Sequence, residues 1–170
     1  MSKRVPDFIN PFRAAEGGYG IAGQLAFTRM GRLLEVVENT DGVAKVELVF
    51  GTDEQGIAHV RGQVDTEVVL ICQRCLEAMT VPIHVEMDLG IVGSDDEANR
   101  LPERYDPLVA GEQFLVAGLI EDEILLALPA VARHDDAVCA AVKGLPGDDE
   151  KAPESSANPF AVLARLKTDR

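Results

Sequence analysis

Three stretches in the middle of the chain alternate apolar and polar residues, the period-two pattern of a strand with one buried face. They span residues 44–50, 57–71 and 81–89, and short polar segments separate them. Short connections favour antiparallel neighbours. Gly62 is a position where the second strand can kink, and Pro82 fits near a strand start or at a sheet edge. We therefore predict a small antiparallel β-meander between about residues 44 and 91.

Two other stretches repeat apolar residues every three or four positions, the spacing of one helix face. The clearer pattern covers residues 114–128, and Pro129 ends it because proline cannot continue a helix. A shorter pattern covers residues 30–37. The sequence thus predicts the α+β class, with one or two helices packed against the sheet. The apolar helix positions are Ala117, Ile120, Ile124, Ala127 and Leu128, and Met30, Leu33, Leu34 and Val37.

The segments outside these patterns are polar or rich in turn-forming residues. Residues 1–24, with two prolines and a glycine cluster, predict irregular chain. Residues 93–107 are acidic and turn-rich, which predicts a surface loop.

The C-terminal part of the chain predicts a separate organisation. Residues 143–157 are acidic and poor in apolar residues, as in a disordered linker. Asn158 and Pro159 then form a typical helix start. The predicted organisation is one α+β domain over residues 1–142, followed by the linker and a short amphipathic C-terminal helix over residues 158–170.

Charge sets the strongest limit on function. The chain has 16 Lys and Arg against 29 Asp and Glu, a formal net charge of −13. Nucleic-acid-binding domains are usually basic, because their cations displace the counterions of the phosphates. A broad contact with RNA is therefore not expected. An Arg-containing N-terminal patch remains as a local alternative, formed by Arg4, Arg13, Arg29 and Arg32.

The sequence also bears on location. No apolar run approaches the ~20 residues that cross a bilayer, and the charged start is not followed by the apolar stretch of a secretory signal. We expect a cytoplasmic protein with no membrane association. Its three cysteines, an odd number in a reducing compartment, argue against a disulfide framework.

Cys72 and Cys75 flank two residues between two predicted strands. Two thiolates at this spacing on a tight turn can face one cation, as in zinc knuckles. His134 and Cys139, beyond the clearer helix, are candidates for the two remaining ligands. Three thiolates and one imidazole would form a closed structural zinc site. A redox pair, which needs a helix start beside a parallel strand, and inert thiols remain alternatives.

Nothing in the sequence forms a catalytic constellation that outweighs a structural explanation. The histidines lack metalloprotease spacing, and no serine or glycine pattern matches a nucleophile elbow or a phosphate loop. Glu121, Asp122 and Glu123 are consecutive, so on a helix they diverge by about 100° and cannot converge on one ion. We interpret them as a solvent-exposed helix face. The sequence predicts that the protein is not an enzyme.

Four segments follow one another from the middle of the chain to its end. They are residues 72–77 (CQRCLE), 101–107 (LPERYDP), 121–129 (EDEILLALP) and 158–163 (NPFAVL). Together they resemble the family of large ribosomal RNA subunit accumulation proteins, the YceD family, while residues 1–60 match it only in general character. Related members can carry additional cysteines after the long helix, where this chain has His134 and Cys139.

The resemblance implies a role in the synthesis, processing or stability of 23S rRNA during large-subunit biogenesis. We expect a non-enzymatic factor that acts through ribosomal proteins or large-subunit assembly intermediates, since an acidic surface attracts basic partners. Two alternatives remain. One is a direct RNA-binding protein that uses the N-terminal arginines, and the other is a metal- or thiol-dependent enzyme.

Overall fold

The computed structural model describes residues 3–135 and residue 139, and its centre is a six-stranded sheet. The order is β1-β3-β4-β5-β6-β7, with antiparallel middle strands and parallel outer pairs. A separate two-stranded ribbon joins β2 to β8. The strands are β1 (Lys3–Arg4), β2 (Phe8–Ile9), β3 (Gly20–Ala26), β4 (Val43–Thr52), β5 (Ala58–Ile71), β6 (Ala78–Val92), β7 (Asp106–Val109) and β8 (Phe114–Leu115).

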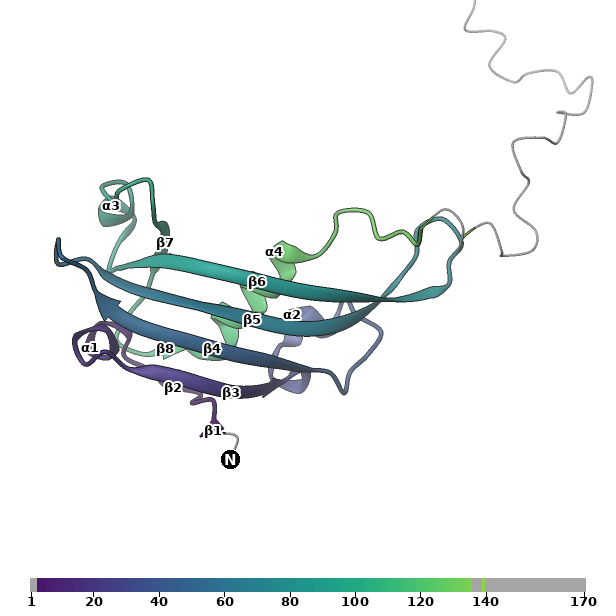
Figure 1. The fold of residues 1–170 in the computed structure, drawn as a ribbon, viewed down its shortest axis with the longest axis horizontal. Coiled ribbons are helices and arrows are strands. Elements are labelled where there is room, and N and C mark those ends of the chain that lie inside the picture. Colours follow the sequence, from purple (N-terminus) through teal and green to yellow (C-terminus); the bar gives the residue numbers. More distant parts are fainter. Residues whose placement is uncertain (1–2, 136–138, 140–170) are drawn as a thin grey trace, which may run out of the picture.

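The predicted meander is confirmed by β4, β5 and β6, which pair consecutively as antiparallel neighbours. Figure 1 shows the helices α2 (Gly31–Leu34) and α4 (Val116–Ala127) behind the sheet, so one of its faces is covered. Alternation along β4 follows from this arrangement, because every second side chain points toward the helices. Those side chains are buried, and they belong to Ala44, Val46, Leu48 and Phe50.

Gly62 lies in the interior of β5, where the backbones of β4 and β5 approach closely. A Cβ at this position would lie 2.1 Å from the carbonyl oxygen of Glu47. Pairing with Leu48 and Met87 continues through the glycine without a break in register. Glycine is therefore required here by the close approach of two strands.

The predicted helix over residues 114–128 is observed as α4, which begins two residues later because Phe114 and Leu115 form β8. Its apolar side packs against the sheet and includes Ile120 and Ile124, both fully buried. The predicted exposed acidic face is wrong at Glu121, which is only 7% exposed. The next residue, Asp122, is exposed as expected.

Glu121 is buried because its carboxylate accepts hydrogen bonds from the backbone N–H groups at the start of α2. Its carboxylate accepts hydrogen bonds from the backbone N–H groups of Arg32 (2.6 Å) and Leu33 (3.0 Å), and from the Arg32 guanidinium. The first N–H groups of a helix lack partners within it. Met30, at the N-cap of α2, provides no side-chain acceptor. A carboxylate from α4 therefore takes the place of a local cap.

The predicted helix over residues 30–37 is shorter than the apolar pattern indicated. A 3₁₀ turn, η1 (Phe27–Arg29), precedes the four-residue α2. The apolar positions were nevertheless identified correctly, because Met30, Leu33 and Val37 are buried in the core.

The prediction of irregular chain over residues 1–24 is wrong. Helix α1 (Pro11–Glu16) begins after Asn10, whose side chain accepts a hydrogen bond from the backbone N–H of Arg13 at 3.0 Å. Strand β3 follows and pairs with β4 over its full length. Its pattern is weak in the sequence because glycine and alanine separate its buried residues, Ile21 and Leu25.

The acidic segment over residues 93–107 contains a short helix, α3 (Asp95–Ala98), and leads into β7. None of the helices in the described part of the chain is long and apolar enough to cross a membrane. The predicted linker over residues 143–157 and the predicted helix over residues 158–170 lie outside the described residues.

Candidate metal centre

The turn that joins β5 to β6 carries Cys72 and Cys75. It is closed by backbone hydrogen bonds from Cys72 N to Glu77 O and from Leu76 N to Cys72 O, both 2.9 Å long. Leu76 adopts a positive φ of 63°, which turns the chain back toward β6. The two thiols therefore lie on one tight turn, as the spacing in the sequence predicted.

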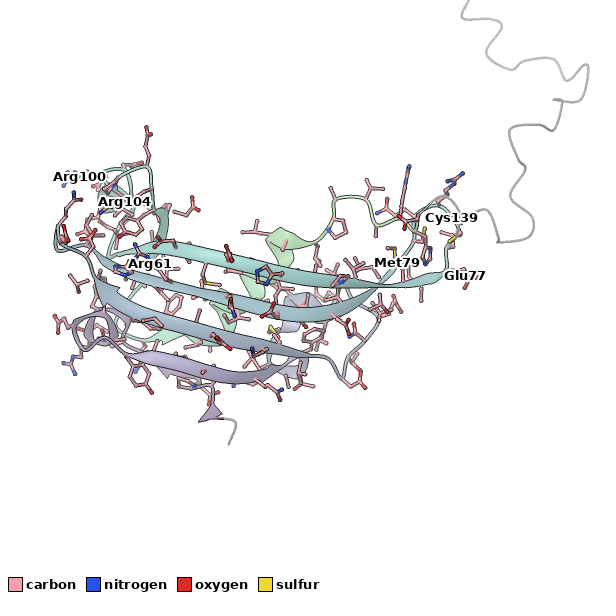
Figure 2. All side chains as sticks on the ribbon, in the orientation of Figure 1. Arg61, Glu77, Met79, Arg100, Arg104 and Cys139 are labelled. Carbon is pink, nitrogen blue, oxygen red and sulfur yellow. The ribbon has the colours of Figure 1, made fainter. Side chains whose placement is uncertain are left out.

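The chain that follows α4 runs to the same turn. The backbone N–H of Gln73 donates to Ala132 O at 2.8 Å, and Ala132 is buried. This contact brings the segment against the hairpin just before His134. Figure 2 shows Cys139 at this end of the sheet, beside Glu77 and Met79 of the hairpin.

All four predicted ligands meet at this point. The sulfur atoms of Cys72 and Cys139 are 3.6 Å apart, and Cys75 Sγ lies 3.3 Å from His134 Nδ1. The four ligand atoms lie within 4.8 Å of one another. Cys72 and Cys139 are buried, whereas Cys75 and His134 are half-buried. Residues 67 positions apart in the sequence thus form one cluster.

This arrangement fits a tetrahedral cation. Zinc bonds of about 2.0–2.3 Å to nitrogen and sulfur place tetrahedral ligand atoms roughly 3.5–3.8 Å apart. The Cys72–Cys139 and Cys75–His134 separations are close to these values, and the other ligand atoms lie within 4.8 Å of one another. The backbone N–H of His134 also donates to Cys72 Sγ at 3.4 Å, the kind of outer contact that orients a thiolate ligand. The cluster can hold a metal ion.

The two buried thiols differ in acidity. Backbone N–H groups of Cys75, His134 and Arg74 lower the pKa of Cys72 to about 5, although burial acts in the opposite direction. Burial raises the pKa of Cys139 to about 11, and the neighbouring thiols of Cys72 and Cys75 add to this effect. Several thiolates repel one another in a small buried volume, so they are stable together only beside a cation.

The local structure also bears on whether Cys72 and Cys75 form a redox-active thiol pair. Cys72 and Cys75 lie in a hairpin turn between antiparallel strands, not at a helix start beside a parallel strand. Redox-active cysteine pairs typically lie at the N-terminus of a helix, which lowers the pKa of the reactive thiol. The geometry therefore favours a closed ligand set over redox chemistry.

A second polar cluster, at the opposite end of the sheet, was not anticipated. Asp53 accepts hydrogen bonds from the backbone of Gln55 and Ile57, from the Tyr105 hydroxyl at 3.1 Å and from the Arg104 guanidinium at 2.5 Å. Figure 2 shows Arg104 at this end, near Arg61. Asp53 in a turn sequence predicts the backbone contacts, but nothing local predicts Tyr105. The cluster ties the β4–β5 turn to the segment before β7.

Comparisons with known proteins identify the family of this chain. The family model described as "Large ribosomal RNA subunit accumulation protein YceD" matches residues 60–167, a range that includes the four clustered residues. A protein of that name from Haemophilus influenzae is 36% identical over 172 residues, which cover 96% of this chain and 97% of the relative. No solved structure matches the chain. The chain therefore belongs to the YceD family of large ribosomal RNA subunit accumulation proteins.

Proposed function

We propose that this protein is a non-enzymatic, cytoplasmic factor that supports the 23S rRNA of the large ribosomal subunit. It does so by contacts with basic ribosomal proteins or with assembly intermediates. Membership of the YceD family supports the rRNA role. The net charge of −13 supports protein contacts over a broad contact with RNA, since phosphates repel carboxylates.

The uncovered sheet face has more carboxylates than cations. In the registers of β4, β5 and β6, five carboxylates share that face with the cations Lys45 and Arg61. The negative charge of this face accelerates encounter with a basic partner and repels the phosphates of RNA. The carboxylates belong to Glu47, Asp65, Glu67, Glu86 and Asp88.

Two of the four N-terminal arginines are less suited to RNA than the sequence alone indicated. Arg29 forms an ion pair with Asp7. Arg32 contacts both Glu121 and Asp122. A guanidinium that already has a carboxylate partner gains less from a phosphate, because the first contact must be broken. This supports protein contacts over direct RNA binding.

Two experiments test the proposal. Deletion of the gene is expected to lower 23S relative to 16S rRNA, and normal ratios with normal subunit profiles would refute it. The tagged protein is expected to migrate with large-subunit precursors in a gradient and to remain bound to their proteins after RNase treatment. Tight binding of purified protein to naked 23S fragments at physiological salt would instead favour the RNA-binding alternative.

We further propose that Cys72, Cys75, His134 and Cys139 bind a structural zinc ion. Four protein ligands complete a tetrahedral shell and leave no open position for substrate, which is the arrangement of structural sites. Such an ion would fasten the segment after α4 to the β5–β6 turn. This role also supports a non-enzymatic function.

Metal content and thermal stability test the zinc proposal. Protein purified with reductant is expected to contain near-stoichiometric zinc, and Cys72→Ser is expected to lower both metal content and melting temperature, because site formation and folding are coupled. His84→Ala, at an exposed histidine outside the cluster, is the control and should retain the metal. Metal-free protein whose melting is unaffected by added zinc would refute the site and leave inert thiols.

A further inference from the structure

Strand β6 has a partner along only part of its outer edge. β5 pairs with it from Gly90 to Ala78, whereas β7 pairs only with the four residues from Leu89 to Val92. Figure 1 shows β7 beside one end of the much longer β6. Within the described residues, positions 78–88 of β6 have no strand on their outer side.

Pro82 indicates which backbone groups face this open edge. Proline has no N–H to donate, so its nitrogen must face away from β5. In an antiparallel pair, alternate residues direct their N–H and C=O groups to the same side. Val92 lies an even number of residues after Pro82, so its backbone groups point to the same side. Its carbonyl oxygen accepts a hydrogen bond from the backbone N–H of Ala110 on the outer side of β6. By this rule His84, Glu86 and Asp88 present their N–H and C=O groups outward.

A groove runs between this open edge and helix α4. Its volume is about 520 Å³, and residues 86–89 of β6 form one wall. Apolar side chains line it, among them Met87, Leu119 and Leu126. Leu126 is 81% exposed, an unusual exposure for a leucine on a packed helix. An added strand would have apolar surface to cover here.

Acidic residues also line this groove, and no lysine or arginine lines it among the described residues. They are Asp106, Asp122 and Glu123, together with Glu86 and Asp88, whose side chains belong to the uncovered face of the sheet. Partial burial raises the pKa of Glu123, and the nearby Asp106 and Asp122 add to the effect. Asp88 Oδ1 is buried without a hydrogen-bond partner in the described structure. Arg32 and Arg61 each contact one of these residues, Asp122 and Asp88, from outside the groove.

We propose that the open edge of β6 binds an extended, Lys- or Arg-rich segment of a protein partner as an additional strand. The backbone groups of His84, Glu86 and Asp88 would pair with it, as in other cases of strand addition. The apolar side chains of the added strand would cover the apolar residues that line the groove, and its cations would pair with the acidic residues that line it. The proposal rests on the proposed function, because it specifies how an acidic factor holds a basic protein of the large subunit.

Exposed edges pair readily with other strands unless charge, proline or a covering segment prevents it. Here Pro82 closes one end of the edge and β7 closes the other. The interval between them is the length of a short strand. The edge therefore selects a segment of about five residues that alternates apolar and basic side chains.

Synthetic peptides test the proposal directly. An eight-residue peptide of alternating lysine and valine is added to the full-length protein, and an alternating glutamate and valine peptide is the control. Backbone amide NMR is expected to show slowed hydrogen exchange at His84, Glu86 and Asp88 with the lysine peptide. Its affinity is expected to exceed that of the glutamate peptide by at least about tenfold, because acidic residues line the groove. Equal binding of both peptides would overturn the proposal.

Variants at Glu86 separate backbone pairing from charge. Glu86→Pro removes an outward N–H while its pairing with β5 is retained, and it should weaken lysine-peptide binding by about tenfold or more. Glu86→Gln keeps the backbone N–H and should weaken binding of the lysine peptide less. The double reversal Glu86→Lys and Asp106→Lys, at two exposed positions, should abolish binding without altering the melting temperature. Equal binding by the proline and glutamine variants would overturn the strand-addition geometry.

The chain's own C-terminal segment is the competing occupant. If it fills the edge, the three amides will exchange slowly in the free protein and quickly after truncation beyond residue 139, which would overturn the partner proposal. Ribosome gradients separate this inference from the proposed function. Unchanged migration of Glu86→Pro with large-subunit precursors would refute strand addition at the β6 edge and leave the proposed function intact. Peptide binding without any ribosome association would support strand addition at the β6 edge and refute the proposed function.

Discussion

Replacing Glu121 with alanine is expected to destabilise the fold far more than the same change at an exposed acidic residue of α4. The Glu121 carboxylate accepts four hydrogen bonds of 2.6–3.0 Å, two from the backbone at the start of α2 and two from the Arg32 guanidinium. Without it, the backbone N–H groups of Arg32 and Leu33 lose an acceptor that solvent cannot readily replace. A buried donor left unpaired costs about 1–3 kcal/mol.

Two such donors give an expected loss of about 2–6 kcal/mol in the free energy of unfolding, and the Arg32 guanidinium adds little because its side chain is more than half exposed. For a chain of this length, 1 kcal/mol shifts the melting temperature by roughly 2–4 °C. Glu121→Ala should therefore lower it by about 4–24 °C. Glu121→Gln, which retains an acceptor oxygen but loses the charge, should show a smaller fall.

Thermal and urea unfolding, followed by circular dichroism, would measure both variants beside Asp122→Asn. Asp122 contacts the same Arg32 guanidinium at 2.6 Å, but both side chains are more than half exposed. Hydrogen bonds with Asp122 and then Glu121 raise the pKa of Arg32, yet exposed pairs contribute at most about 1 kcal/mol. If Glu121→Ala were no more destabilising than Asp122→Asn, the argument that Glu121 caps α2 would be wrong.

Three further predictions concern the sheet. Gly62→Ala should lower the melting temperature by several degrees, because its Cβ would collide with the β4 backbone, whereas Gly31→Ala, with no atom within 4 Å of the added carbon, should leave it unchanged. The hydrogen bond with Asp65 raises the pKa of His84, so NMR titration should give a value above 6.5 that falls in Asp65→Asn. The stability from this pair should be present below pH 6.5 and lost as pH rises through the raised pKa. Asp53→Asn should destabilise the β4–β5 turn, which faster amide exchange there would reveal.

Part of this fold follows from local rules that the sequence obeys closely. The alternation in β4, β5 and β6 identified three neighbouring strands, because one face of an antiparallel sheet is buried and the other is solvated. The 3.6-residue period identified α4 for the same reason. β3 was missed because its glycines and alanines give the alternation little contrast. Helix α1 was missed although Asn10 and Pro11 form the same Asn–Pro pair from which a helix start was predicted at residues 158–159.

The cluster of Cys72, Cys75, His134 and Cys139 could likewise be predicted only in part. Cys72 and Cys75 could be paired from the sequence, since two residues between two thiols on a tight turn fix their separation. His134 and Cys139 could be proposed only as candidates. Their approach to the hairpin depends on the direction in which the chain leaves α4 and on the contact between Gln73 and Ala132. Those are long-range features that local periodicity does not contain.

Glu121 shows most clearly what only the tertiary structure decides. In the sequence it is one of three consecutive acidic residues, and such a run on a helix is normally solvated. Its burial depends on a helix start that lies 88 positions earlier in the chain and has no cap of its own. A sequence pattern reports which side chains prefer water, but whether a buried donor needs an acceptor at a given point depends on how distant elements pack. The sequence by itself therefore determined the three central strands, the long helix and the first thiol pair, while packing decided the role of Glu121 and brought His134 and Cys139 to the hairpin.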